Sequence, residues 1–574
     1  MDIITQLLHK ALSGIGPFFL LLGILIFVHE LGHYLVAVFF GVRVETFSLG
    51  FGKKIFKYKR GDTTYCLSII PLGGYVKMYG DDPSATIPED QKQYSFLHKP
   101  VWPRIAIVLA GPIMNLFWAI LVFAAIGMMG EEVPGNRVGD IEPKTAAYAA
   151  GFRSGDTIVA VNDVSENQWE KIKASIEESA DHPLKFSVKH ENSDAVETIT
   201  ATPLLKKNDF LFTTERQVGK IEGLSLDSIS TMIGVPNPES AAAKAGLKTM
   251  DVIEAVDGKS VTYWRQVEQA FQNPTQEKHS WILTVRAYSE KAADGKEAPK
   301  RDITIEAPQF KTDEGKASAT VDSLASITSQ LGFKRSDLFL LRVNPDSPAA
   351  KAGLAAGDEV TQLDGKTITG WQDVLDKVKS FQPSQKAIAF TVIHEGKTKD
   401  VSITPDLVEL PTDQGAMEKR FAIGVLPAIM MGPTSSYLLK YTNPIHAVGH
   451  GISQAYSWSK LIAISFVRLL QNEVSAKNIG GVITIGRVAS KSFEVGIVAF
   501  LKMMGVISIN LFILNLLPVP VLDGGHLVFF GIEALKGAPI SFRKMEIAQQ
   551  VGLVLLLSLM IFALFNDITH LIAS

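Results

Sequence analysis

Five consecutive residues, His29-Glu30-Leu31-Gly32-His33, combine two imidazoles and a carboxylate at a spacing suited to metal-dependent hydrolysis. On a helix, His29 and His33 lie one turn apart on the same face, so both rings can bind one Zn²⁺ ion. Glu30 lies beside them, where its carboxylate can take a proton from a water molecule activated by the metal. These residues predict a zinc-dependent hydrolase with Glu30 as the catalytic residue.

The surroundings of this motif are apolar enough to lie in a membrane. PFFLLLGILIFV precedes the motif and YLVAVFFGV follows it. Charged and imidazole groups at such a depth are costly, which indicates a functional site. The apolar run continues to Val42 with no small-residue cleavage site, so we expect a retained transmembrane helix and not a signal peptide.

Composition excludes several classes of protein. The 574 residues are too many for one domain, and 47% hydrophobic with 20% charged residues indicates membrane spans combined with soluble modules. A net charge of -3 gives no support for nucleic-acid binding. The single cysteine, Cys66, excludes a disulfide framework.

Four segments are long and apolar enough to cross a membrane: 15–40, 105–129, 497–517 and 551–565. Basic residues gather between the first two spans and between the last two, which places both loops in the cytoplasm. The N-terminus, the C-terminus and the large middle region are then predicted outside, in the periplasm, with the active site towards the cytoplasmic side.

Residues 44–78 predict short strands that dip towards the site. Alternating and β-branched residues are interrupted by Gly-Phe-Gly, Arg-Gly-Asp and Gly-Gly turns. A sheet at membrane depth must pack on protein or line a wet cavity, and its edge could pair with an extended substrate. An ordinary cytoplasmic hairpin is the alternative.

The middle region contains three related copies, at 146–163, 240–258 and 347–365. In each copy a glycine precedes an aspartate by the same step, and the pattern predicts a short helix, a turn and a strand. The copies resemble circularly permuted PDZ domains, which bind extended peptides or chain ends by adding a strand to a sheet edge. A spacer or size filter is the alternative. The predicted domains are 1–130, 131–210, 215–310, 320–410, 411–490 and 491–574.

Residues 445–471 predict an amphipathic helix on the outer membrane surface, since a fifth span would reverse the direction of the segment at 497–517. His446 and His450 are one turn apart there, but no carboxylate accompanies them, so a surface role is favoured over metal binding.

A catalytic zinc site usually has three protein ligands, and NLLPVPVLDGGH at 515–526 offers candidates for the third. Asp523 and His526 both suit zinc, and Asp523 could instead cap the following helix; spacing alone does not decide. Asn515 could hydrogen-bond a substrate or a developing oxyanion, or else another helix. The GPIMN segment at 111–115 favours close helix packing.

Together, His29 to His33, GPIMN at 111–115, NLLPVPVLDG at 515–524 and IPLGGYVKM at 70–78 resemble the site-two protease family of intramembrane zinc metalloproteases. The resemblance implies one Zn²⁺ held by His29, His33 and Asp523, with Glu30 as general base. Asn515, Pro518 and Pro520 match positions linked to substrate handling. Residues 44–78 resemble the family's membrane-re-entrant β element.

The resemblance also implies a function and a location. Bacterial members reside in the inner membrane and cleave single-span proteins, including anti-sigma factors and remnant signal peptides. The expected fold is therefore a four-span α-helical membrane protein with a re-entrant β element and three inserted periplasmic PDZ-like α/β domains. The rival hypotheses are a non-enzymatic, membrane-anchored PDZ scaffold or chaperone and, with little support from four spans, a transporter.

Overall fold

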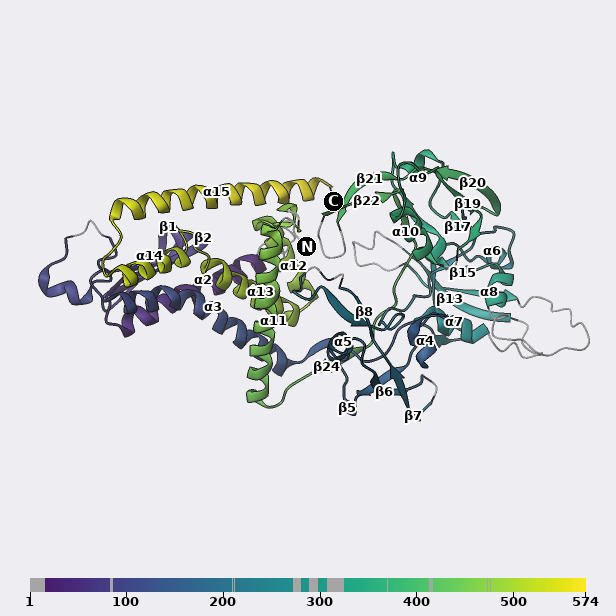
Figure 1. Ribbon diagram of the computed structural model, residues 1–574, viewed down its shortest axis with the longest axis horizontal. Helices are drawn as coiled ribbons and strands as arrows, with labels where there is room; N and C mark the ends of the chain where they lie inside the picture. Colours follow the sequence, from purple (N-terminus) through teal and green to yellow (C-terminus); the bar gives the residue numbers. More distant parts are fainter. Residues whose placement is uncertain are drawn as a thin grey trace, which may run out of the picture.

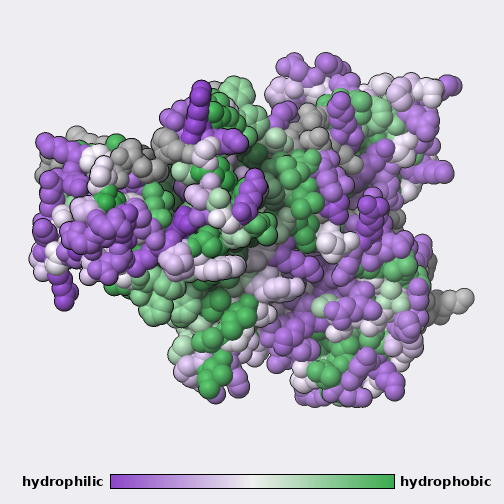
Figure 2. All heavy atoms as spheres, turned by 60° about the vertical axis from the view of Figure 1, so that its left-hand side comes forward, coloured by the Kyte–Doolittle hydropathy of each residue, from purple (hydrophilic) through white to green (hydrophobic). Residues whose placement is uncertain are grey.

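The computed structural model describes residues 16–573, except 83–85, 192, 209, 211, 272–279, 289–297, 307–324, 369, 412–416, 472 and 475. A membrane half and a repeat region lie side by side in Figure 1, with the membrane half on the left. In Figure 2 hydrophobic side chains cover much of the middle of the membrane half, while hydrophilic side chains dominate its far tip and the repeat region.

Four helices in the described part of the chain are long and apolar enough to cross a membrane, as the sequence predicts. They are α2 (Gly16–Phe39), α3 (Val101–Met129), α13 (Ile497–Asn515) and α15 (Phe542–Ala573). The bounds of α3 and α15 differ most from the prediction. Helix α3 begins before residue 105 because Pro100 and Pro103 allow a helix start there. Helix α15 extends well beyond the apolar core at 551–565 at both ends.

Strands β1 (Val44–Arg60) and β2 (Thr63–Met78) form an antiparallel sheet beside α2. Thr46 pairs with both Thr64 and Lys77, because each long strand bends back on itself. The positive φ angles of Gly50 and Gly52 allow this bend, since a left-handed backbone is inexpensive only for glycine. The segment at 74–78 thus forms one edge of the sheet, and no further strand of the described chain pairs with it.

The repeat region contains three units with the same strand order. In each, a short strand, a central strand and a hairpin form a four-stranded antiparallel sheet. The sheets are β5-β4-β6-β7, β12-β11-β13-β14 and β18-β17-β19-β20. Their strands are Val164–Ser165, Thr157–Val161, Leu184–Lys189 and Val196–Ala201; Lys259–Ser260, Asp251–Val256, Ser280–Ala287 and Arg301–Glu306; and Lys366–Thr367, Glu359–Leu363, Ile388–His394 and Lys397–Ile403.

Each unit also has a short helix and a longer amphipathic helix: α4 (Ala146–Ala150) and α5 (Trp169–Glu178), α6 (Ala241–Ala245) and α7 (Trp264–Phe271), and α9 (Pro348–Lys351) and α10 (Trp371–Lys379). The remaining strands join or extend the units: β3 (Glu131–Pro134), β8 (Leu204–Lys207), β9 (Gln217–Lys220), β10 (Ile233–Gly234), β15 (Lys334–Arg335), β16 (Leu340–Val343), β21 (Asp406–Pro411), β22 (Met417–Ala422), β23 (Val425–Pro427) and β24 (Ser436–Leu439). Helix α8 spans Ala325–Leu331.

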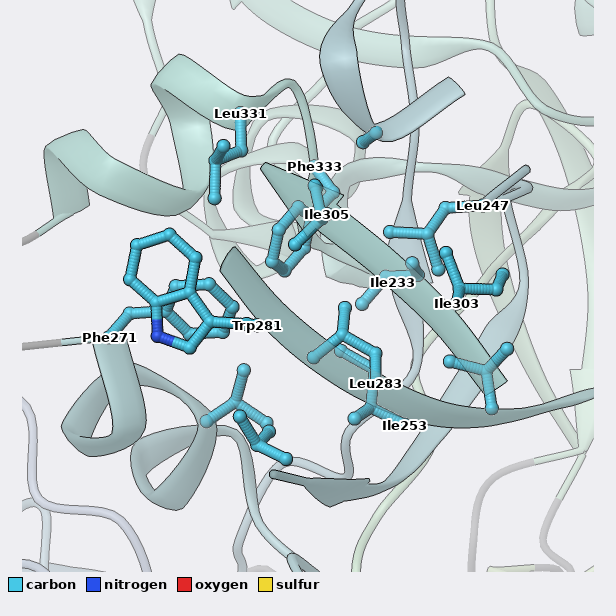
Figure 3. Close-up of a cluster of buried hydrophobic side chains, with 14 of the residues drawn as sticks. Ile233, Leu247, Ile253, Phe271, Trp281, Leu283, Ile303, Ile305, Leu331 and Phe333 are labelled. Carbon is cyan, nitrogen blue, oxygen red and sulfur yellow. The ribbon is translucent and has the colours of Figure 1, made fainter. Parts of the chain in front are cut away.

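The units extend further along the chain than the predicted limits at 210, 310 and 410. Their buried cores run from Val138 to Ile221, from Ile233 to Phe333 and from Leu340 to Ile423. Figure 3 shows the second core, where Phe333 lies among Phe271, Trp281 and Leu331. The segment that closes each core follows the recognisable repeat and lacks its motif, so the predicted membrane-associated region at 411–490 begins too early. The predicted linker between 310 and 320 lies outside the described residues.

Helix α11 (Pro444–Leu470) confirms the helix predicted at 445–471 and runs across the direction of α3 and α15 in Figure 1. Its buried residues are small and one turn apart: Ala447, Gly451 and Ala455. A methyl group on Gly451 would overlap the backbone of α3 at Ile120, so the two helices cross in direct backbone contact. The opposite face exposes large apolar side chains, including Ile445 and Tyr456. The helix is therefore amphipathic, as the sequence predicts.

A second helix, α12 (Val482–Val495), follows and was not predicted separately. The Asp567 carboxylate of α15 accepts hydrogen bonds from the backbone amides of Gly481 and Ile483 at 2.8 and 2.9 Å. These contacts satisfy amides at the start of α12 that lack partners within their own helix. Helix α12 therefore connects the C-terminal end of α15 to α2 and α13, which α12 also contacts.

The repeated aspartates bind the turns that precede the central strands. One carboxylate oxygen of Asp156, Asp251 and Asp358 accepts the backbone amide of the residue three positions earlier, at 2.7–2.9 Å. Each carboxylate also binds a basic side chain: the second oxygen of Asp156 and of Asp358 contacts His190 and His394, and the oxygen of Asp251 that accepts the amide also binds Arg301.

The contact between Asp156 and His190 predicts that the stability of the first repeat unit depends on pH. The hydrogen bonds that His190 donates to the carboxylates of Asp156 and Glu197 raise its pKa above the ordinary value. The pair's stabilisation is therefore complete below the ordinary histidine pKa of about 6.5 and is lost as pH rises through the raised pKa. Because His190 is partly exposed, we expect an effect on the order of 1 kcal/mol or less.

Hydrogen–deuterium exchange of the full chain, corrected for intrinsic rates, measures this effect. Exchange in β4 and β6 should accelerate between about pH 6 and pH 8 relative to β11 and β13, because Arg301 stays charged. In a His190→Gln variant, exchange in β4 and β6 should show the same pH dependence as exchange in β11 and β13. An identical pH response in the wild type and this variant would contradict the assignment.

Candidate functional site

Helices α2 and α3 cross at two glycines, and this crossing gives space to the histidine pair. A methyl group on Gly32 would overlap the carbonyl of Ala110, so the two backbones touch. A methyl group on Gly111 would overlap the ring of His33 and press on that of His29. The GPIMN segment therefore has the packing role predicted for it, and it creates the space that both imidazoles occupy.

A tight turn brings Asp523 to the same place. Helix α13 ends at Asn515, and α14 (Asp523–Lys536) begins at Asp523 itself. The intervening turn folds back so closely that a methyl group on Gly524 would overlap Leu517, and one on Gly525 would overlap Pro520. The two glycines thus permit close backbone approach, while the prolines prevent α13 from continuing.

His29, His33 and Asp523 present ligand atoms that all lie within 4.8 Å of one another, the one such group of three found among the described residues. Asp523 Oδ2 lies 3.2 Å from His29 Nε2, and Asp523 Oδ1 lies 3.6 Å from His33 Nε2. The two Nε2 atoms are 3.3 Å apart. His526, the other candidate from the sequence, lies outside this group and packs against Phe529 and Phe530.

The far sides of both imidazoles have partners on α3. His33 Nδ1 donates a hydrogen bond to the carbonyl oxygen of Ile107 at 2.8 Å. His29 Nδ1 lies 3.2 Å from the side-chain amide of Asn115. A metal-binding histidine needs its second nitrogen fixed in this way, so that the ring keeps its orientation and tautomer.

Glu30 lies between the histidine pair and the sheet. It is 8% exposed, and a methyl group on Gly74 would press on its side chain. Gly74 belongs to the edge segment at 74–78 of β2. The carboxylate and an open sheet edge therefore meet beside the three ligand atoms.

A buried ion pair holds α14 against α3. The Arg104 guanidinium, 8% exposed, binds the Glu533 carboxylate through both terminal nitrogens and lies over the Phe530 ring, 4.8 Å from its centre. Breaking such a pair leaves an uncompensated buried charge and costs about 3–5 kcal/mol. This contact fixes the helix that begins with Asp523.

The other predicted residues lie near this centre or away from it. Asn515 and Pro520 are half-buried in the α13–α14 turn, and Pro518 is exposed there. His446 is exposed on α11, and His450 packs on Tyr441 with its ring centre 5.1 Å away. Neither belongs to the group of candidate metal ligands found among the described residues.

Sequence reasoning missed the roles of four supporting residues: Ile107 and Asn115, which contact the histidines, and the ion pair of Arg104 and Glu533. The Ile107 contact is made by a backbone carbonyl, which carries no sequence signal. Asn115 gave a signal as a polar residue in an apolar span. Arg104 and Glu533 are each ordinary at a helix end, and only the fold brings them together.

A membrane-embedded histidine pair, a converging aspartate and a buried glutamate define a class of protein, the intramembrane zinc metalloproteases of regulated intramembrane proteolysis. The chain belongs to peptidase family M50, whose model matches residues 17–559. The alternative of a non-enzymatic scaffold is therefore set aside.

Curated relatives cover nearly the whole chain. A zinc metalloprotease of Neisseria meningitidis is 30% identical over 550 residues, which are 96% of this chain and 97% of that protein. The regulator of sigma-E protease RseP of Salmonella typhimurium is 29% identical, and that of Escherichia coli 27%; both matches cover 98% of this chain and 99% of the relative. The family predicted from the sequence is confirmed.

The crossing at Gly111 predicts that a single methyl group disturbs the site. Gly111→Ala should displace the imidazoles, at an overpacking cost of about 1–3 kcal/mol, and should lower zinc content and proteolysis together. Gly23→Ala, on the adjoining helix α2, is the control, because no atom lies within 4 Å of the added methyl. Zinc analysis of the purified proteins checks the prediction. A Gly111→Ala protein with full zinc content would refute it.

Proposed function

We propose that His29, His33 and Asp523 hold one Zn²⁺ ion and that Glu30 is the general base and acid of peptide-bond hydrolysis inside the membrane. The convergence of the three ligand atoms within 4.8 Å is the observation that carries the proposal. Two imidazoles and a carboxylate are a common zinc donor set, which leaves a fourth position for water or substrate.

The chemistry follows from the positions of these side chains. A bound zinc ion supplies Lewis acidity, which polarises the scissile carbonyl and makes water more acidic. Glu30 takes the proton of the attacking water and delivers it to the amine that leaves when the C–N bond breaks. Its low exposure excludes competing bulk water from this proton transfer.

A transmembrane substrate must first unwind, because helical carbonyls are already hydrogen-bonded. We propose that the unwound segment adds a strand to the sheet edge at 74–78, a membrane-re-entrant element that replaces the lost hydrogen bonds. The contact of Gly74 with Glu30 supports this, because a strand on this edge runs past the base. Asn515, Pro518 and Pro520 would contact the substrate from the α13–α14 turn.

The repeat units are proposed to be three PDZ-like domains that bind peptides or chain ends. Their motifs and shared strand order support this reading. An apolar groove in the third unit runs beside α10, lined by Trp371, Leu375 and Phe421, with Arg420 at its edge. A corresponding groove lies beside α5 in the first unit.

The proposed substrates are single-span membrane proteins, including anti-sigma factors and remnant signal peptides. Full-length similarity to proteins named regulator of sigma-E protease supports the first of these. The proposed location is a bacterial inner membrane, with the repeat units and both termini in the periplasm and the active site towards the cytoplasm. The basic residues of the sheet and of the adjoining ends of α14 and α15 (Lys536, Arg543 and Lys544) support this orientation.

Replacing Glu30 by Gln tests the proposed base. The amide has nearly the same shape but accepts no proton at neutral pH, so cleavage of a model transmembrane substrate should fall by about 10²–10⁴-fold while zinc stays bound. His29→Ala is the companion variant and should lose zinc as well as activity. Normal turnover by the Glu30→Gln protein would eliminate the proposed role.

The single cysteine makes the orientation testable. In a Cys66→Ser background, Lys397→Cys in the third unit should react with a membrane-impermeant maleimide in intact bacterial spheroplasts. Lys57→Cys in the sheet should react only after the membrane is opened. The reverse pattern would overturn the proposed orientation.

A further inference from the structure

Asn115 is the most unusual residue in the membrane half. Its side chain is completely buried in an apolar helix, with 0% exposure. Its amide nitrogen lies 3.2 Å from His29 Nδ1, while its amide oxygen has no hydrogen-bond partner in the described part of the chain. A buried amide with half of its hydrogen-bonding capacity unused costs stability, so packing alone does not account for it.

The orientation of this amide sets the tautomer of His29. With its nitrogen towards Nδ1, the amide donates, and the ring proton must lie on Nε2, the atom that faces Asp523. A half-turn of the amide presents the oxygen instead, so that Nδ1–H donates and the Nε2 lone pair is free for a cation. Only the second arrangement allows His29 to bind a metal through Nε2.

The position of Asn115 is fixed by a contact with α13. The Ser508 hydroxyl of α13 donates a 2.7 Å hydrogen bond to the Asn115 backbone carbonyl, and Ser508 is fully buried. Gly111, one turn earlier on α3, leaves the space in which the His29 ring meets the amide. The amide therefore sits at a junction of three spanning helices.

We infer that Asn115 is a positioning residue for the metal centre: its amide oxygen accepts the Nδ1 proton of His29 and holds Nε2 ready to bind Zn²⁺. This is the counterpart of the Ile107 carbonyl, which accepts the Nδ1 proton of His33 at 2.8 Å. The inference rests on the proposed ligand set. It assigns Asn115 no contact with substrate and no part in proton transfer.

Two substitutions separate positioning from packing. Asn115→Leu keeps the approximate size of the side chain but removes the acceptor. We expect about 10–100-fold weaker zinc binding, as for other residues that support metal ligands, with zinc-free stability unchanged or increased. Asn115→Asp keeps an oxygen acceptor for Nδ1–H and should restore zinc affinity to the wild-type range.

The measurements are zinc affinity of the full-length protein in detergent, by competition with a chelator, and thermal unfolding of the zinc-free protein. Wild-type zinc affinity in Asn115→Leu would overturn the inference. Equal losses of affinity in both variants, accompanied by lower zinc-free stability, would also overturn it, because they indicate a packing role. The His29→Ala variant tests the proposed zinc ligands independently of the role of Asn115. If that variant retains zinc, the proposed ligands are wrong whatever the Asn115 variants show.

Discussion

Placing charged side chains inside an apolar bundle is the constraint on which the rest of this structure depends. A carboxylate and two imidazoles at this depth are tolerable only if they face one another or a cation. The chain meets this requirement by packing both α2 and α14 against α3, although His33 and Asp523 lie at opposite ends of the sequence. Three features bring these helices together: the glycines at the close contacts, the turn at 516–522 and the Arg104–Glu533 ion pair.

The same constraint explains where irregular backbone appears in the membrane half. Strand edges and broken helices expose amides and carbonyls that lipid cannot satisfy. Here the bent sheet lies against α2 and the turn between α13 and α14 folds onto its own glycines. The open edge at 74–78 is left beside Glu30, where a substrate strand would satisfy its free backbone groups. An exposed edge that would be a liability elsewhere is, in the proposed mechanism, the surface that binds substrate next to Glu30.

Much of this arrangement can be predicted from the sequence, because polar and charged residues in apolar segments are easy to recognise. His29, Glu30 and His33 interrupt an apolar run at helical spacing, and Asp523 follows two helix-breaking prolines. The choice between Asp523 and His526 is different, because it depends on the exact residue at which α14 begins and thus on how closely the turn packs on Gly524 and Gly525. The ends of the repeat units were placed too early for a related reason: Phe333 and Ile423 complete their cores from segments outside the recognisable motif.

Contacts made by backbone atoms are the part that sequence patterns cannot supply. Asp567 binds amides at the start of α12, and His33 binds the carbonyl of Ile107. In each pair one partner is a backbone group, which every residue carries and no sequence pattern marks. Asn115 lies between these cases, since its amide is conspicuous in an apolar span but its partner is not. A polar residue at that depth can join helices or orient a ligand, and sequence analysis favoured the first. The Asn115 amide faces His29 through its nitrogen and leaves its oxygen unpaired, which favours the second, because a group selected only to join two helices would be expected to use both of its hydrogen-bonding atoms.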